Sequence, residues 1–276
     1  MSTLRTYVGD KLVAIGDILE KPYQRPSNYP SITEPTASEE KIVVLMRVYK
    51  PFGTGNSARN TLHPNFTSSS GATFTITGSD GTSQTLNSGT NYTVAFSYDN
   101  ATSYAIDINS AVSGTGYYIE DLGDTSQTDW NTLAGTSGVT YVVGDYITAD
   151  VAGSTLSNTT GTVSIYNFRH IVVTATGTNW TSANRSALPV ARNVAFEEIY
   201  VSLPNYNNAG LNGLNFIRHL YVQKNVRYVK YLTNLSSVTD ASSFCRHYTS
   251  LVEFNCPSDF LQNATNMGSF LTTVLS

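Results

Sequence analysis

A short phrase that occurs twice near the C-terminal end is the strongest constraint on how this chain folds. Residues 238–244 read Val-Thr-Asp-Ala-Ser-Ser-Phe, and residues 264–270, which begin 26 positions later, read Ala-Thr-Asn-Met-Gly-Ser-Phe. An apolar-x-x-apolar-x-apolar pattern also starts at Phe196, Ile217 and Leu251. Repeats of about 20–29 residues are typical of leucine-rich solenoids, in which each unit buries its apolar edge against its neighbours. We therefore expect an array of stacked units, with the apolar runs as its strands.

The spacing of these runs makes the array irregular, because the intervals are 21 and 34 residues. The longer interval contains either a degenerate unit or an insertion. Two phrases, Thr265-Asn266-Met267-x-x-Phe270 and Phe244-Cys245-x-x-x-x-Ser250-Leu251, resemble the BspA-like leucine-rich repeats of bacterial surface proteins and of some phage virion proteins. The resemblance implies a core position for Cys245 and a surface that holds a partner. Ala241 departs from the pattern, which prefers Met there.

The composition favours a β-rich adhesive or stalk protein over a nucleic-acid-binding one. Charged residues make up 13% of the chain, against about 25% in an ordinary soluble domain. Ser, Thr, Asn and Gly fill the difference, together with 18 Tyr, which supply contact area. The net charge is −4, and a basic cluster that would bind phosphates is missing from the sequence. We expect no cofactor, no nucleic-acid partner and no membrane insertion.

The start of the chain does not read as a secretory signal, because charged residues interrupt residues 2–20. The longest apolar run, residues 42–46, is far shorter than the ~20 residues that span a bilayer. The composition is nevertheless that of an extracellular surface. Phage structural proteins combine these properties, because they assemble in the host cytoplasm and leave by lysis. We therefore predict that the protein is located in a virion.

Residues 1–40 are predicted to form an extended N-terminal arm that docks into the particle. Prolines at positions 22, 26, 30 and 35 prevent regular structure there, so the segment is either a flexible leader or lies along another subunit. One short amphipathic helix in the arm would carry the docking residues Leu12, Val13, Ile15, Ile18 and Leu19.

The middle of the chain is predicted to form one or two small antiparallel β-sandwich or barrel units, divided into a first β domain over residues 41–110 and a second over residues 111–180. In the first, residues 72–77 and 82–86 alternate around an Asp80-Gly81 turn, and residues 92–98 and 104–108 alternate around Asp99-Asn100. In the second, a phrase of about 20 residues that begins at Trp130 resembles a module repeated in phage tail and appendage proteins. It predicts a Trp anchor, a Gly turn, a strand, a second turn and a second strand. These are structural features, and none of them indicates a catalytic residue.

Residues 181–276 are predicted to form the irregular leucine-rich-repeat solenoid, so the fold class is mainly β. Side chains between the apolar positions of its strands would face outward along one sheet. These form either a receptor-facing surface or an ordinary solvated sheet. The candidates for receptor contact are Tyr200, Arg218, His219, Tyr221, Glu253 and Asn255. The chain ends at Ser276 without a polar capping unit, so we expect a further subunit or further chain to cover that end.

Catalytic and metal-binding motifs are missing from the sequence. The four histidines and two cysteines have no metal-ligand spacing, and the acids of residues 120–129 match no calcium loop. Glu197 and Glu198 are adjacent in a predicted strand, so we expect their side chains on opposite faces, unable to act as an acid/base pair. The chain is therefore predicted not to be an enzyme.

Together these features favour a phage virion structural protein, a tail or head fibre or appendage that attaches to the host. Its partners would be other virion proteins, a host receptor or glycan, and copies of itself, with a homotrimer favoured. The alternatives are a bacterial cell-surface adhesin with BspA-like repeats, a glycan-degrading appendage enzyme, and a purely structural neck, baseplate or decorating component.

Overall fold

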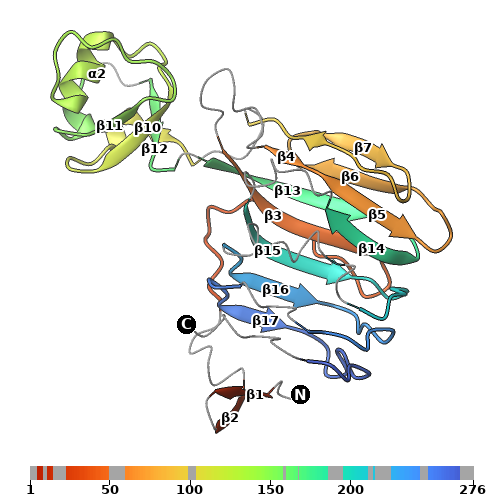
Figure 1. The fold of residues 1–276 in the computed structure, drawn as a ribbon. Helices are drawn as coiled ribbons and strands as arrows, with labels where there is room; N and C mark the ends of the chain where they lie inside the picture. The colour runs from red at the N-terminus through yellow and green to blue at the C-terminus, as the bar shows by residue number, and fades with distance from the viewer. Residues whose placement is uncertain are drawn as a thin grey trace. The chain divides into compact units, whose positions relative to one another are not determined.

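The computed structural model describes residues 5–8, 11–14, 23–49, 60–98, 104–157, 160–166, 168–185, 195–210, 214, 225–242 and 248–267. The fold is mainly β, with α2 (Gln127–Ala134) as the single α-helix in this part of the chain (Figure 1). No helix of the described residues is long and apolar enough to cross a membrane.

The chain divides into two compact units. The large unit comprises residues 1–101 and 170–276, and the small unit, residues 102–169, is inserted between these two parts. These boundaries differ from the predicted ones at 40/41, 110/111 and 180/181. Sequence-adjacent hairpins suggested successive domains, whereas β3 (Lys41–Tyr49) pairs with β15 (Ala195–Ser202), about 150 residues away, within one sheet.

A mixed seven-stranded sheet forms the centre of the large unit. Its order is β17 (Glu253–Asn255), β16 (Tyr228–Tyr231), β15, β3, β13 (Phe168–Thr176), β6 (Phe74–Gly78) and β7 (Ser83–Leu86). Every residue of β15 is buried, and so are residues 42–46 of β3. Continuous burial shows that both faces of these strands are covered, which explains their apolar runs.

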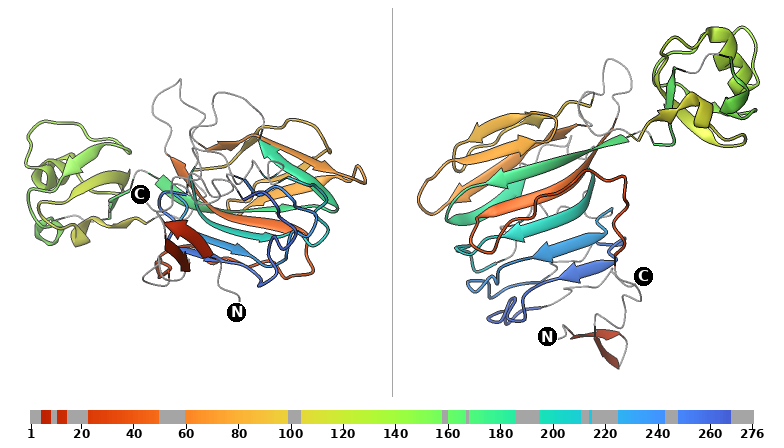
Figure 2. Two further views of the ribbon diagram at one scale, coloured as in Figure 1. Left: turned by 60° about the horizontal axis from the view of Figure 1, so that its bottom comes forward. Right: turned by 180° about the vertical axis from the view of Figure 1, so that it is seen from behind.

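Two small antiparallel pairs complete the large unit beside this sheet (Figures 1 and 2). They are β5 (Pro64–Ser68) with β14 (Trp180–Arg185), and β4 (Thr61–Leu62) with β8 (Val94–Ala95). The Trp180 ring lies 4.5 Å from Phe74 and 5.0 Å from Phe66, so aromatic packing joins β14 and β5 to β6. Among the described residues, none of the sheets closes into a barrel.

Of the two predicted hairpins, one forms. Strands β6 and β7 pair antiparallel from Phe74↔Leu86 to Thr77↔Ser83, and Gly81 in the turn has φ +92°. The hairpin predicted between residues 92–98 and 104–108 is wrong. Strand β8 pairs with β4, and β9 (Ile106–Asp107) pairs with β12 (Thr162–Ser164), because the boundary between the units separates β8 from β9.

The C-terminal strands β15, β16 and β17 are parallel and lie side by side (Figure 2). Ile199 is in register with Val229, and Val229 with Phe254, at intervals of 30 and 25 residues. The predicted run at 217–222 lies outside the described residues. The observed middle strand carries the same pattern as Val226-x-x-Val229-x-Tyr231, inside the interval between residues 217 and 251.

The repeated phrase also pairs with itself. Asp240 forms parallel bridges with Gly210 on one side and Asn266 on the other. The Thr265 amide donates to the Thr239 carbonyl at 2.8 Å, and the Ala241 amide donates to the Asn266 carbonyl at 2.8 Å. The described parts of the two copies, residues 238–242 and 264–267, therefore lie next to each other in register.

The small unit contains a four-stranded antiparallel sheet, with order β11 (Tyr146–Thr148), β10 (Gly116–Asp121), β12, β9, and the short 3-10 helices η1 (Ile108–Ser110) and η2 (Gly153–Thr155). Trp130 on α2 is fully buried in its core, as the predicted anchor requires. The strand predicted after Gly138 is not formed. Side chains of α2 bind the backbone of Val139 and Tyr141 and so take the place of a strand ladder there.

The N-terminal residues do not form the predicted helix. β1 (Arg5–Val8) and β2 (Lys11–Ala14) make an antiparallel hairpin, which places Leu12 and Val13 in a strand. Val, Thr and Tyr favour strands, which explains the difference. Ile15, Ile18 and Leu19 lie outside the described residues. Residues 23–40 contain neither helix nor strand, in agreement with their prolines.

Candidate functional site: a charged cluster under the N-terminal segment

One face of the seven-stranded sheet carries a cluster of charged and aromatic side chains, and residues 23–34 cover it. Tyr23, Arg25 and Tyr29 of this segment bond side chains of β15. The Lys230 ammonium on β16 bonds Glu34 at 2.5 Å. We call this surface the covered face and residues 23–34 the covering segment. The predicted extended arm is therefore wrong for this stretch, because its polar groups find partners on its own chain.

A β-bulge places the two adjacent acids of β15 in this cluster. Phe196 pairs with Met46 and Glu198 with Leu45, so Glu197 is an extra residue without a position opposite. In a bulge, two residues of one strand oppose one residue of the other, and strict alternation is interrupted. Both carboxylates consequently contact the covering segment, and the prediction that they point to opposite faces is wrong.

Glu198 holds the first part of the covering segment. Its side chain is fully buried and accepts from the Tyr23 hydroxyl at 2.8 Å and from Arg25 Nε at 3.0 Å. Tyr200, two residues along the strand, donates to the same carboxylate at 3.3 Å. Arg25 also donates to the Pro30 carbonyl at 2.6 Å, which fixes the bend of the segment. A buried carboxylate with several donors and a guanidinium satisfies the conditions for a buried ion pair.

Glu197 makes the equivalent contacts farther along the segment. It accepts a hydrogen bond from the Tyr29 hydroxyl and pairs with the Arg47 guanidinium of β3. His170 Nε2 lies 3.4 Å from Glu197 Oε2, the oxygen that accepts from Tyr29, and the His170 ring lies 4.6 Å from the Tyr29 ring. The cluster thus balances two carboxylates with two guanidinium groups.

Burial changes the protonation of the neutral members of the cluster. His170 is 1% exposed, and burial, with Arg47 and Arg25 nearby, lowers its pKa to about 3. The imidazole is therefore uncharged at neutral pH. Burial also raises the pKa of Tyr23 and of Tyr200, and the Glu198 charge raises both further. These phenols remain donors to the carboxylate across the physiological range.

The outer part of the covered face holds the start of the covering segment. The Tyr23 ring stacks on Tyr228 at 5.4 Å, and the Arg227 guanidinium lies 5.9 Å from the Tyr23 ring centre. The Tyr23 amide donates to Glu253 at 2.7 Å. Asn255 donates to the Tyr228 hydroxyl and to Glu253.

The structure therefore brings three of the predicted receptor-facing residues onto the covered face. Tyr200 is buried, at 4% exposure, and Glu253 and Asn255 are half-buried. Arg218, His219 and Tyr221 lie outside the described residues. The sequence prediction did not identify Tyr23, Arg25, Tyr29 or His170. The sequence signal that could have identified Tyr23, Arg25 and Tyr29 is the occurrence of tyrosine and arginine between closely spaced prolines, which indicates an extended segment that binds a surface.

The arrangement is suited to fixing a segment and not to acid/base chemistry. Both carboxylates are fully buried, and each already contacts a guanidinium. Among the described residues, no group of three or more His, Cys, Asp or Glu side chains converges on a metal position. In the acidic stretch 120–129, Glu120 pairs with Arg169, and Asp129 bonds Ser126 and Ser157.

No family model, no curated protein and no solved structure matches this chain.

Proposed function

We propose that this protein is a non-catalytic structural component of a phage virion, a fibre or appendage that attaches the particle to its host. The pairing of the repeated phrase supports the proposal most directly. Parallel bridges join Gly210, Asp240 and Asn266, and parallel strands recur at intervals of 30 and 25 residues. This is the stacking that an irregular leucine-rich-repeat solenoid requires, and the resemblance to BspA-like repeats connects such an array to surface attachment.

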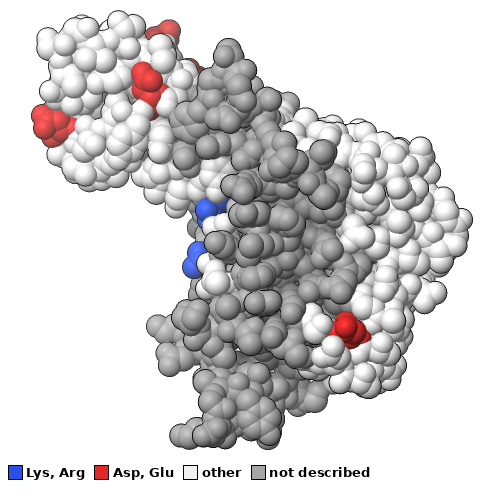
Figure 3. All heavy atoms as spheres, viewed as in Figure 1, with Lys and Arg blue, Asp and Glu red and all other residues white. Residues whose placement is uncertain are grey.

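The charged cluster supports a structural role over an enzymatic one. A general acid or base needs a carboxyl group that a substrate reaches, whereas Glu197 and Glu198 are both 0% exposed. The face of the molecule drawn in Figure 3 carries only scattered charged residues over its described part. Such a surface suits contacts that depend on shape, hydroxyl groups and aromatic rings.

In this proposal the two ends of the chain have different partners. The N-terminal residues, including Leu12 and Val13 of the β1–β2 hairpin, dock to other virion proteins, and copies of the chain assemble as a homotrimer. The C-terminal repeats contact the host. Because residues 23–34 cover Tyr200, contact of a receptor with that side chain requires displacement of the covering segment.

Competition for adsorption tests this role. Purified full-length protein, added to host cells before the phage, should reduce adsorption in proportion to its concentration. A matched variant, Lys230→Glu with Glu34→Lys, keeps this exposed ion pair but exchanges the two charges. Its competition shows whether the positive charge at position 230 contributes to host binding. Unchanged adsorption at saturating protein would contradict the attachment role.

The same preparation separates the proposal from its rivals. A glycan-degrading enzyme would release new reducing ends from host capsule or cell-wall glycan, whereas we expect none. A bacterial adhesin would be found on the surface of uninfected cells, whereas we expect the protein only after infection.

A further inference from the structure

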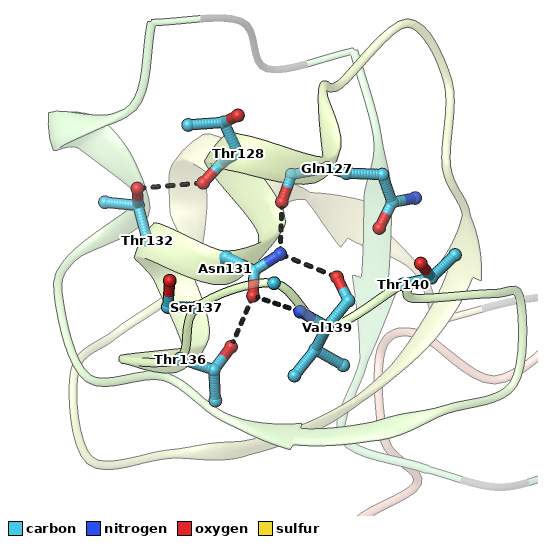
Figure 4. A pocket seen from close by; sticks show the side chains of 9 residues that line it. Gln127, Thr128, Asn131, Thr132, Thr136, Ser137, Val139 and Thr140 are labelled. Carbon is cyan, nitrogen blue, oxygen red and sulfur yellow. Dashed lines mark hydrogen bonds between the residues drawn. The ribbon is translucent and has the colours of Figure 1, made fainter.

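The small unit contains a polar pocket, formed by residues that the attachment role described above does not use. It has a volume of about 470 Å³ and is lined by Gln127, Thr128, Asn131, Thr132, Thr136, Ser137, Gly138, Val139 and Thr140. Figure 4 shows α2 on one side and the loop of residues 136–140 on the other. The volume is within the range of about 300–1,000 Å³ typical of small-molecule sites.

Two amide side chains of α2 hold the loop in place. Asn131 donates to the carbonyls of Gln127 and Val139, and its oxygen accepts from the Val139 amide and the Thr136 hydroxyl. Gln127 bonds both the amide and the carbonyl of Tyr141. The pocket wall is therefore fixed by side chains whose own hydrogen-bonding groups are satisfied. A fixed wall lowers the entropy cost of binding a ligand.

The remaining hydroxyl groups are available to a ligand. The Thr128, Ser137 and Thr140 side chains are exposed, and within the part of the chain that the structure describes their hydroxyls make no hydrogen bond. Val139, which is 42% exposed, adds methyl groups between them. A hydroxyl donates one hydrogen bond and accepts two, so these groups match a ligand that is itself rich in hydroxyls.

The charge of the lining selects the class of ligand. None of the nine lining residues carries a formal charge, so the pocket has no cation for a phosphate or carboxylate and no carboxylate for a metal ion. A neutral saccharide combines hydroxyl groups with apolar C–H faces, against which the Val139 methyl groups could pack. We propose that this pocket binds a neutral saccharide of one or two sugar residues. The inference rests on the proposed attachment function. It adds to that function a second site of contact with the host, and a saccharide as the receptor group bound there.

Titration of the ¹⁵N-labelled full-length protein with galactose, N-acetylglucosamine and lactose tests this assignment. We expect amide shifts confined to the pocket, with a dissociation constant on the order of 1 mM for at least one sugar. The double variant Ser137→Ala/Thr140→Val should weaken binding about tenfold, since it removes two hydrogen-bonding groups. The matched control, Ser83→Ala/Thr85→Val on exposed positions of β7, should bind as the wild type does.

Three results would overturn the assignment. The first is the absence of amide shifts at residues 136–140 at a sugar concentration roughly fifty times the expected dissociation constant. The second is binding by the pocket variant as strong as that by the wild type. The third is stronger binding of inorganic phosphate than of any neutral sugar. The two proposals fail separately. If the wild-type protein binds none of the sugars but still competes for adsorption, the pocket assignment alone is refuted. If the wild-type protein does not compete, the attachment role is refuted even if the sugar binds.

Discussion

Replacement of Arg25 by methionine is the sharpest perturbation of the covering segment. Methionine keeps much of the aliphatic length but removes the 3.0 Å bond to Glu198 and the 2.6 Å bond to the Pro30 carbonyl. The Glu198 carboxylate then stays buried with phenol donors alone. Loss of one partner of a buried ion pair costs about 3–5 kcal/mol. Because Arg25 is itself 31% exposed, water solvates part of its charge, and we expect about 2–3 kcal/mol.

Hydrogen exchange measured by mass spectrometry reports this loss where it occurs. A decrease of 2–3 kcal/mol in the free energy of local opening corresponds to roughly 30- to 160-fold faster exchange in peptides from residues 23–34. Peptides from β6 and β7, at the other end of the sheet, should keep their protection. Adding Glu198→Gln to Arg25→Met should recover part of the loss, because the uncompensated charge is then gone.

The matched control is Lys41→Met, which removes a partly exposed ion pair with Glu39, whose side chain is 40% exposed. Exposed pairs contribute about 0–1 kcal/mol, so this variant should exchange nearly as the wild type does. If Arg25→Met has no larger effect on peptides 23–34 than Lys41→Met has, the buried carboxylates do not hold the covering segment and the reasoning is refuted.

Three further predictions concern burial. Unfolded His170 takes up a proton near pH 6.5 but the folded protein does so only near pH 3, so the large unit should lose stability as pH falls through this window. Urea titrations should show that the free energy of unfolding falls less steeply with pH in His170→Gln than in the wild type. An equal fall in the two proteins would exclude His170 as the cause. Trp130→Ala should cost about 3–5 kcal/mol in the small unit, seen by calorimetry, while a transition of the large unit that moves equally would contradict the division into units. Burial raises the pKa of Cys256 to about 11, so little of its thiol is ionised at pH 8. In a Cys245→Ser variant, iodoacetamide should therefore react slowly with Cys256 until urea unfolds the chain. Fast reaction in the native protein would show that the thiol is accessible.

Local patterns in the sequence predicted the parts of the fold that depend on neighbouring residues. The alternation around Asp80-Gly81 specified the β6–β7 hairpin, because a tight turn fixes its register. The repeated phrase specified which residues stack, since Asp240 and Asn266 pair at the interval that the sequence shows. Both relations are set by short spacing along the chain.

Long-range pairing explains most of the differences. The partner of β3 is β15, and no local signal in residues 41–49 identifies a strand so distant. Strand β16 was missed because Tyr231 occupies the last apolar position of the pattern, which Val201 and Cys256 fill in the runs of β15 and β17. The covered face depended on a bulge at Glu197, which alternation alone does not reveal, and on the bend that Arg25 stabilises in the covering segment.

Imaging of whole virus particles tests the central claim most directly. An antibody raised against this chain, followed by a gold-labelled secondary antibody, would be applied to particles purified from lysates of cells that express the gene. The account predicts gold at one regular position on intact particles, removed by prior incubation of the antibody with purified protein. Two results would contradict the account. One is the absence of gold from the particles although mass spectrometry detects the chain in the lysate fraction. The other is gold on cell envelopes instead of particles.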